Sequence, residues 1–254
     1  MKKIISLILT LALAASSIFV MSSCQKEKLI VGITDYEPMD FKDPETGEWI
    51  GFDAELAKMF AESLGKECVF VEIDWDNKVA EINNGSIDLI WNGMTASDEL
   101  GEKIDFSVSY AKNAQVAVAK KNSGITKDQV PTLKIAVEGG SAGETVANEI
   151  KTTGTISDPG DQVMALTEVA SGNSEVAIVD ITLAQSVLGK GAFADLEIVS
   201  GASYGDEIFA VGIKQGNTIK ADLDAFLKAK YADGTMTELA TKYNVGLNTE
   251  ALSE

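Results

Sequence analysis

Two residue types that this chain lacks narrow its chemistry more than any motif it contains. All 21 basic residues are lysine, and the sequence has neither histidine nor arginine. A Ser-His-Asp or Cys-His relay therefore cannot form, and metal sites built on histidine are excluded. The absence of arginine also removes the planar side chain that usually holds a carboxylate or a phosphate with two parallel hydrogen bonds. Enzymatic chemistry is thus disfavoured, and we expect neither a metal nor a cofactor.

Two other patterns could bind charged groups. Residues 139–143 read Gly-Gly-Ser-Ala-Gly between a predicted strand and a predicted helix. Glycines let backbone N–H groups approach an anion, and a helix start adds partial positive charge. No Gly-Lys-Ser/Thr follows, so this is not a Walker loop, and a plain turn is the alternative. Asp180 stands between a strand and a helix, where it caps the helix, offers its carboxylate to a cation, or does both.

The elements that must position these residues alternate between strands and helices. Alternation of this kind implies right-handed crossovers and a layered α/β architecture. The pattern falls into two regions, with a predicted hinge at 120–124, and the last two helices are free to return to the first region. The predicted strands are 29–33, 69–73, 87–91, 114–119, 134–137, 176–179, 196–199 and 208–213, and the predicted helices are 52–60, 76–82, 142–151, 162–170, 181–188, 218–231 and 236–243.

The N-terminus predicts export. Met1-Lys2-Lys3 is followed by a largely apolar run over 4–20, which is marginal for a membrane span, and by small residues before Cys24. We expect residues 1–23 to be a signal peptide. The Ser-Ser-Cys boundary resembles a bacterial lipoprotein cleavage site, which implies that Cys24 is acylated, that 24–28 form a spacer, and that the protein is extracytoplasmic and anchored to the cell membrane. A freely secreted protein is the alternative.

Composition limits the partners. The formal net charge is −18 and no basic cluster interrupts it, so we expect no binding to nucleic acid. The only other cysteine, Cys68, lies in an apolar run and is predicted to be a buried strand thiol without a disulfide. The length without the signal peptide suffices for one large domain or two compact lobes.

Several short motifs follow one another in a telling order: Tyr36-Glu37-Pro38-Met39, Gly51-Phe52-Asp53-Ala54-Glu55-Leu56-Ala57, Gly85-Ser86-Ile87-Asp88-Leu89-Ile90, Trp91-Asn92-Gly93-Met94-Thr95, Asp105-Phe106-Ser107 with Tyr110, and Ala232-Asp233-Gly234-Thr235. Through them the chain resembles the family 3 solute-binding proteins, the extracytoplasmic receptors of polar amino-acid ABC transporters. The resemblance implies the type II periplasmic-binding-protein fold, with two α/β lobes joined by two crossing strands and a ligand cleft between them. Lobe one would span 29–116 plus 210–254, and lobe two 117–209.

The same resemblance implies ligand-binding residues in lobe one. Tyr36 and Trp75 would form aromatic walls, with core packing as the alternative, and Met39 stands where the family usually has phenylalanine. Gly93 would offer a carbonyl group to the ligand ammonium and Thr95 a hydroxyl to its carboxylate. Asn92 beside them could serve either charge, a tight turn is the alternative for this segment, and Trp91 would point away into the core.

In lobe two, the resemblance assigns the ligand carboxylate to the glycine-rich loop. The usual hydroxyl position falls at Ala142, so Ser141 or the backbone N–H groups near Gly140 would have to replace it. Asp180 matches the carboxylate that pairs with the ligand ammonium.

The largest departure from the family pattern is Leu100, which stands where an arginine normally holds the ligand carboxylate. Loss of such a contact costs roughly 2–5 kcal/mol if nothing replaces it. Three explanations are open, in order of preference. The glycine-rich loop suffices, the solute is not an ordinary α-amino acid, or Lys103 or Lys112 supplies a point charge.

The implied function is capture of an amino acid or similar small polar solute by lobe closure, without catalysis. The implied partners are the permease and ATPase subunits of an ABC transporter, and we expect a monomer. A solute sensor of the chemoreceptor type is one alternative. A dehydratase-type enzyme on the same scaffold is another, disfavoured because the chain lacks histidine and arginine.

Overall fold

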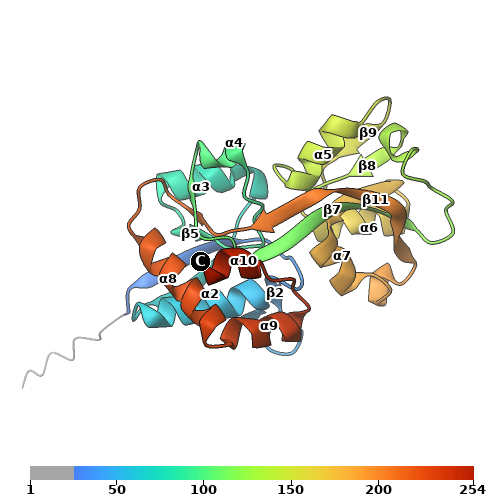
Figure 1. Ribbon diagram of the computed structural model, residues 1–254. Helices are drawn as coiled ribbons and strands as arrows, with labels where there is room; N and C mark the ends of the chain where they lie inside the picture. The colour runs from blue at the N-terminus through green and yellow to red at the C-terminus, as the bar shows by residue number, and fades with distance from the viewer. Residues whose placement is uncertain (1–25) are drawn as a thin grey trace, which may run out of the picture.

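The computed structural model describes residues 26–254, which form two five-stranded sheets (Figure 1). The first sheet has the order β4-β1-β5-β12-β6, with β1 Lys28–Ile33, β4 Glu67–Glu72, β5 Leu89–Ile90, β6 Asp105–Phe106 and β12 Gly212–Ile213. The second has the order β11-β7-β10-β8-β9, with β7 Ala111–Lys120, β8 Lys134–Ala136, β9 Thr155–Ser157, β10 Val176–Asp180 and β11 Leu196–Phe209. The predicted two-lobed α/β architecture is confirmed.

Helices surround each sheet. We call the part of the molecule built on the first sheet the first half, and the part built on the second sheet the second half. Those of the first half are α2 Phe52–Ser63, α3 Lys78–Asn84, α4 Asp98–Gly101, α8 Ile219–Ala232, α9 Thr235–Tyr243 and α10 Thr249–Ser253, with the short 3-10 helix η1 Trp75–Asn77. Those of the second half are α5 Ala142–Ile150, α6 Gln162–Ser171 and α7 Ile181–Val187, with the 3-10 helices η2 Val130–Thr132 and η3 Gly191–Phe193. None of the helices within residues 26–254 is long and apolar enough to cross a membrane.

Apolar spacing explains why these segments fold as they do. On β1, Leu29, Val31 and Ile33 alternate with their neighbours and are buried, as the period of a strand requires. On α2, Phe52 and Phe60 recur at helical spacing and are fully buried. Each segment therefore has an apolar side that is covered by the other elements of the same half.

Two long strands connect the halves. The antiparallel pair β7 and β11 runs from Ala111 opposite Phe209 to Lys120 opposite Leu196. Figure 1 shows the pair side by side between the two groups of helices. A bridge between Thr95 and Phe209 ties one end of the pair to the first half. Segments of both halves therefore meet beside these strands.

The prediction of a hinge at 120–124 is wrong, because these residues do not connect the two halves. Lys121 donates its backbone N–H to the Asp195 carbonyl and its ammonium to the Ala194 carbonyl, so this loop lies at the far end of the β7–β11 pair, within the second half. Its composition resembles a linker because it is an exposed turn. The chain instead crosses between the halves along the first residues of β7.

The C-terminal helices pack against the first half. The Phe226 ring on α8 lies 5.2 Å from the Phe60 ring on α2, and Lys242 on α9 forms a 2.6 Å ion pair with Glu55 on α2. The chain thus leaves the first half once and comes back to complete it.

The structure also adds elements that the sequence pattern missed. The predicted strand 196–199 continues to Phe209 as the long strand β11, whose register shifts between Ile198 and Ser203, and the predicted strand 208–213 covers the end of β11 and the separate strand β12. Turn-like residues hid this continuity, because β7 supplies the hydrogen bonds that the local sequence does not suggest. Other missed elements are too short to show a period, namely the hairpin of β2 Phe41–Lys42 with β3 Trp49–Ile50, and β9, α4 and α10.

Cys68 is a free thiol on β4, half-buried, and burial raises its pKa to about 12. The predicted signal peptide 1–23 and Cys24 lie outside the described residues.

Candidate functional site

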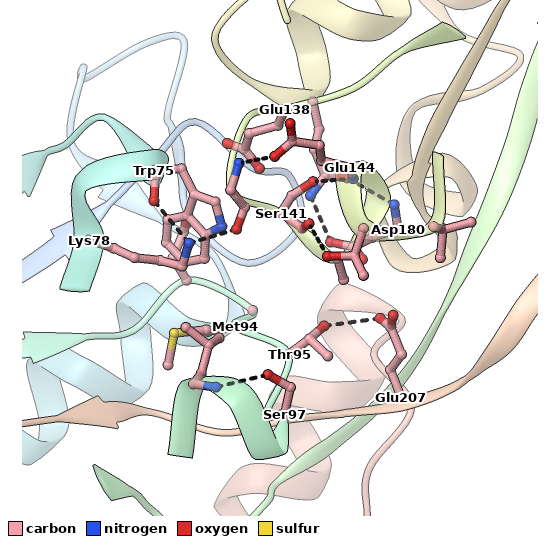
Figure 2. Close-up of a pocket in the computed structure, with 18 of the residues that line it drawn as sticks. Trp75, Lys78, Met94, Thr95, Ser97, Glu138, Ser141, Glu144, Asp180 and Glu207 are labelled. Carbon is pink, nitrogen blue, oxygen red and sulfur yellow. Dashed lines mark hydrogen bonds between the residues drawn. The ribbon is translucent and has the colours of Figure 1, made fainter. Parts of the chain in front are cut away.

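A cleft of about 520 Å3 lies where the two halves meet. The first half lines it with Tyr36, Trp75, Lys78, Asn92, Gly93, Met94, Thr95, Ser97, Glu99 and Leu100. The second half lines it with Glu138, Gly140, Ser141, Ala142, Glu144, Thr145, Val146, Gln162 and Asp180, and β11 adds Glu207. Figure 2 shows Thr95 and Ser97 across the cleft from Ser141 and Glu144. All the predicted ligand-binding residues except Met39 line this cleft.

The turn after β5 is held in place by two buried carboxylates. Gly93 donates its N–H to Asp53 at 2.6 Å, and Asn92 donates its amide to Asp40 at 2.8 Å. Gly93 has a φ of 55°, and a Cβ there would lie 2.6 Å from the Tyr36 ring. Only glycine fits this position, because any side chain would meet both strain and a clash. The Gly-Phe-Asp motif therefore contributes to the cleft by fixing this turn.

The side-chain amide of Asn92 is occupied by hydrogen bonds within the protein. Besides Asp40, its amide group binds the backbone N–H of Thr34 at 2.9 Å and the Thr34 carbonyl at 3.1 Å. It thus orients the turn, and the neighbouring Thr95 supplies the freer polar side chain, which donates to Glu207 at 3.0 Å. Trp91 is fully buried and packs its ring 6.2 Å from Phe60, as predicted.

Two aromatic side chains form walls of the cleft, and Met39 does not. Tyr36 packs edge-on against Phe209 at 6.4 Å, and its buried hydroxyl has no hydrogen-bond partner among the described residues. Trp75 carries the Lys78 ammonium 5.0 Å from its ring centroid. The placement of Met39 is a correction to the predicted lining, because this residue is fully buried in the core beneath Gly93.

Asp180, the carboxylate among the predicted ligand-binding residues, is buried. It accepts hydrogen bonds from Gln162 at 2.7 Å and Gln115 at 2.6 Å, and a third from Asn113. Although Asp180 precedes α7, its side chain makes no capping hydrogen bond, so the alternative of a helix cap is not realised. Burial raises the pKa of Asp180 to about 6, despite these donors. A cation placed beside this carboxylate would be strongly favoured.

In the glycine-rich loop 139–143, two backbone N–H groups already donate to carboxylates of the protein. Gly139 donates its N–H to Asp158 at 3.1 Å, and Gly140 donates to Glu144 at 2.8 Å. The Ser141 hydroxyl accepts the N–H of Glu144 and so caps α5. The N–H groups of Ala142 and Gly143, in the first turn of α5, have no partner within the helix. Of these two residues Ala142 lines the cleft, so its N–H group can meet a negatively charged ligand atom.

The lysine that reaches the cleft is Lys78, which the sequence reasoning missed. Of the two lysines proposed to replace the missing arginine, Lys103 pairs with Glu99 at the surface at 2.8 Å, and neither Lys103 nor Lys112 lines the cleft. Lys78 instead donates to the Trp75 carbonyl at 3.0 Å and to the Gly140 carbonyl at 2.7 Å. A lysine at the start of an amphipathic helix resembles a solvated charge, and its spacing of three residues from Trp75 is the one signal that could have identified it.

The other overlooked residues are three glutamates. Glu138 follows β8 by two residues, Glu144 lies on α5, and Glu207 lies on β11. Burial raises the pKa of Glu138 well above its ordinary value, and the neighbouring charges of Asp180 and Asp161 raise it further. Glu207 accepts from Thr95, Asn113 and Gln115 at 2.9–3.0 Å. Their positions follow from the pairing of distant strands, so no local pattern marks them.

These buried carboxyl groups predict an unusual pH dependence of stability. The pKa of Asp180 is raised to about 6 by burial, and burial also raises the pKa values of Glu138, Asp40 and Asp53. Between the unfolded and folded pKa values the folded protein binds more protons, so its stability falls as the pH rises through this window. Asp180 alone should make the ligand-free protein about 1 kcal/mol more stable at pH 5 than at pH 8.

Urea unfolding of the ligand-free protein at pH 5 and pH 8 measures this difference. The Asp180→Asn variant serves as the control, because it should lose the share contributed by that carboxyl group. A free energy of unfolding that is constant or that increases with pH over this range would contradict the prediction.

Comparisons with known proteins agree with this architecture. The family model of the bacterial extracellular solute-binding proteins, family 3, matches residues 29–246. The histidine-binding periplasmic protein of Salmonella typhimurium is 30% identical, over 96% of this chain and 97% of that protein. An ancestral arginine-binding protein bound to arginine superposes with a TM-score of 0.79 at 26% identity, covering 86% of this chain and 99% of the other. An ancestral amino acid-binding protein described as a precursor of cyclohexadienyl dehydratase superposes with a TM-score of 0.77 at 30% identity, covering 85% and 95%. The fold is that of the type II periplasmic binding proteins.

Proposed function

This chain belongs to family 3 of the bacterial extracellular solute-binding proteins, and we propose on that basis that it captures an amino acid or a similar small amine for an ABC transporter. The observation that carries the proposal is that the cleft is lined by both Asp180 and Tyr36. Asp180 is a buried carboxylate, and the Tyr36 hydroxyl is a buried polar group without a hydrogen-bond partner among the described residues. A ligand ammonium satisfies such a carboxylate, and a cleft of about 520 Å3 suits a small solute.

The similar proteins support an amino acid as the solute. Their names specify binding of histidine and of arginine, and one ancestral structure is described only as amino acid-binding. We propose that the solute ammonium pairs with Asp180 and lies near the Gly93 carbonyl and the Thr95 hydroxyl. Tyr36 and Trp75 would cover its apolar part, and the N–H group of Ala142 would face any carboxylate.

We also propose that binding involves closure of two lobes, 29–116 with 210–254 against 117–209. Contacts that cross the cleft support this view, because they would break on opening. Lys78 donates to the Gly140 carbonyl at 2.7 Å, and Ser186 donates to Glu37 at 2.9 Å. The crossing strands β7 and β11 would bend where their register is irregular.

Acylation of Cys24 would keep such a receptor at the membrane surface, where two or more acyl chains give stable anchoring.

A thermal-shift screen of amino acids and amines tests the proposal directly. A ligand at 100 times its Kd should add about 2.7 kcal/mol to the free energy of unfolding, which raises Tm by several degrees. The ligand should be recovered unchanged, and small-angle scattering should report a smaller radius of gyration when it is bound. Failure of every amino acid and amine to stabilise the folded protein would overturn the proposed function.

A solute sensor would use the same site and differ only in its partner, so binding experiments do not separate the two roles. Copurification does, since a transport receptor should associate with a permease and an ATPase, and a sensor with a signalling receptor. The dehydratase alternative predicts chemical change in a bound cyclic acid, which mass spectrometry of the incubated ligand would detect.

A further inference from the structure

The cleft has a strong excess of negative side chains. Five carboxylates line it, namely Glu99, Glu138, Glu144, Asp180 and Glu207, and Lys78 is the one basic side chain among the described lining residues. Figure 2 shows Lys78 lying along Trp75 and directed at the glycine-rich loop. The Lys78 ammonium is occupied by two carbonyl groups and by the Trp75 ring, and it makes no ion pair within residues 26–254. The basic side chains of residues 26–254 therefore do not balance the negative charge of the cleft.

Most of these carboxylates have partners. Glu99 pairs with Lys103 at the surface, and Glu144 accepts the N–H of Gly140. Glu207 and Asp180 each accept several hydrogen bonds from neutral side chains. These groups are accounted for, either as surface charges or as oriented acceptors.

Glu138 differs from all of them. Its side chain is buried, with the residue only 3% exposed, and its Oε1 atom has no hydrogen-bond partner in the described part of the chain. No lysine lies within ion-pairing distance of it there either. A buried carboxyl group whose oxygen lacks a partner is costly, and a ligand group that pairs with this oxygen would remove that cost.

The surroundings of Glu138 favour a positively charged partner. Burial raises the pKa of Glu138, the charge of Asp180 raises it further, and Lys78 lowers it. A cationic ligand group would therefore gain from both Glu138 and Asp180. A neutral side chain would leave Glu138 unpaired, and an acidic one would add a further negative charge to a cleft without arginine.

We infer that the solute carries a second cationic group that contacts Glu138, in addition to the ammonium group at Asp180, so that the site selects basic amino acids or aliphatic diamines over neutral and acidic amino acids. The inference rests on the proposed function and makes Glu138 the residue that determines specificity. Trp75 and Tyr36 would enclose the methylene groups between the two charges.

Calorimetric titration with defined probes tests the inference on the wild-type protein first. The cationic probes are L-arginine, L-lysine, agmatine and cadaverine, and the comparison probes are L-glutamine and L-glutamate, all with EDTA present so that no divalent cation competes. The tightest cationic probe should bind at least about tenfold more tightly than L-glutamine. Equal or tighter binding of L-glutamine would overturn the inference and leave the proposed function intact, whereas binding of no probe at all would contradict the proposed function.

The Glu138→Gln variant then tests the residue itself. It preserves shape and removes the charge, so the affinity for the tightest cationic probe should fall by about tenfold or more while the affinity for L-glutamine stays constant or rises. Glu149→Gln is the matched control, because Glu149 is an exposed residue on α5 and does not line the cleft. Equal loss for cationic and neutral probes, or no loss for either, would show that Glu138 does not select the charge of the solute.

Discussion

Replacing Asp180 with asparagine is expected to weaken binding of any amine-bearing solute by about 30-fold to several thousand-fold, because one partner of a buried charge pair is removed. The carboxylate is 4% exposed and is oriented by Gln162, Gln115 and Asn113. Asparagine keeps the size of the side chain, so the cleft should keep its shape. It offers no negative charge, and its own NH2 group would face the ligand ammonium.

Isothermal titration with the solute identified by the screen measures this effect. Thermal unfolding without ligand should give a Tm equal to or above that of the wild type, since the variant removes a buried charge and not a packing contact. Asp128→Asn makes the same chemical change at an exposed loop position and should bind normally. An unchanged affinity in the folded Asp180→Asn protein would refute the role assigned to this carboxylate.

Replacing Leu100 with arginine is expected to strengthen binding of solutes that carry a carboxylate by about tenfold or more. Leu100 lies on α4 and lines the cleft, at the position where the family normally has the arginine that holds the ligand carboxylate. A charged hydrogen bond to a carboxylate contributes about 1.5–3 kcal/mol. The amine of the same length without a carboxylate should gain nothing, and repulsion between the new guanidinium and its own charge should weaken its binding.

The comparison of L-arginine with agmatine isolates this effect, because the two molecules differ only in the carboxylate. Their ratio of Kd values should shift toward L-arginine by about tenfold in Leu100→Arg. Leu100→Met retains an uncharged side chain of similar volume and should leave the ratio near that of the wild type. An unchanged ratio in Leu100→Arg would mean that the new side chain pairs with a cleft carboxylate such as Glu144 and does not reach the solute.

Much of the fold could be predicted because its elements are long enough to show a period. The helix that begins at Phe52 and the strand that begins at Lys28 bury their apolar residues as their spacing requires. The short elements β2, β3 and β9 could not be predicted in this way, since two or three residues define no period. The hinge failed for a related reason, because an exposed turn at Lys121 and a linker between lobes have the same composition.

Some residues of the candidate site could be predicted from local motifs, and others could not. Gly93, Thr95 and Asp180 stand in local motifs, at the ends of strands or in sharp turns, where the required residue type is visible in the sequence. Met39 was misplaced because a methionine beside a pocket motif can face either the pocket or the core. Lys78 was missed because its partners, the carbonyl groups of Trp75 and Gly140, carry no side-chain signature.

By itself the sequence determined the class of chemistry and the architecture. The absence of histidine and arginine excludes whole classes of catalytic and binding sites, and the ordered motifs with their strand and helix periods define a two-lobed α/β receptor. Only the tertiary structure decided the charge of the cleft. Glu138 and Glu207 lie far apart in the chain, and each resembles an ordinary surface acid until the pairing of β8 with β10 and of β7 with β10 and β11 brings both to the cleft with Asp180. A carboxylate that is removed from water and placed near another carboxylate needs a cationic partner. Both conditions arise from contacts between distant segments, which no local sequence pattern records.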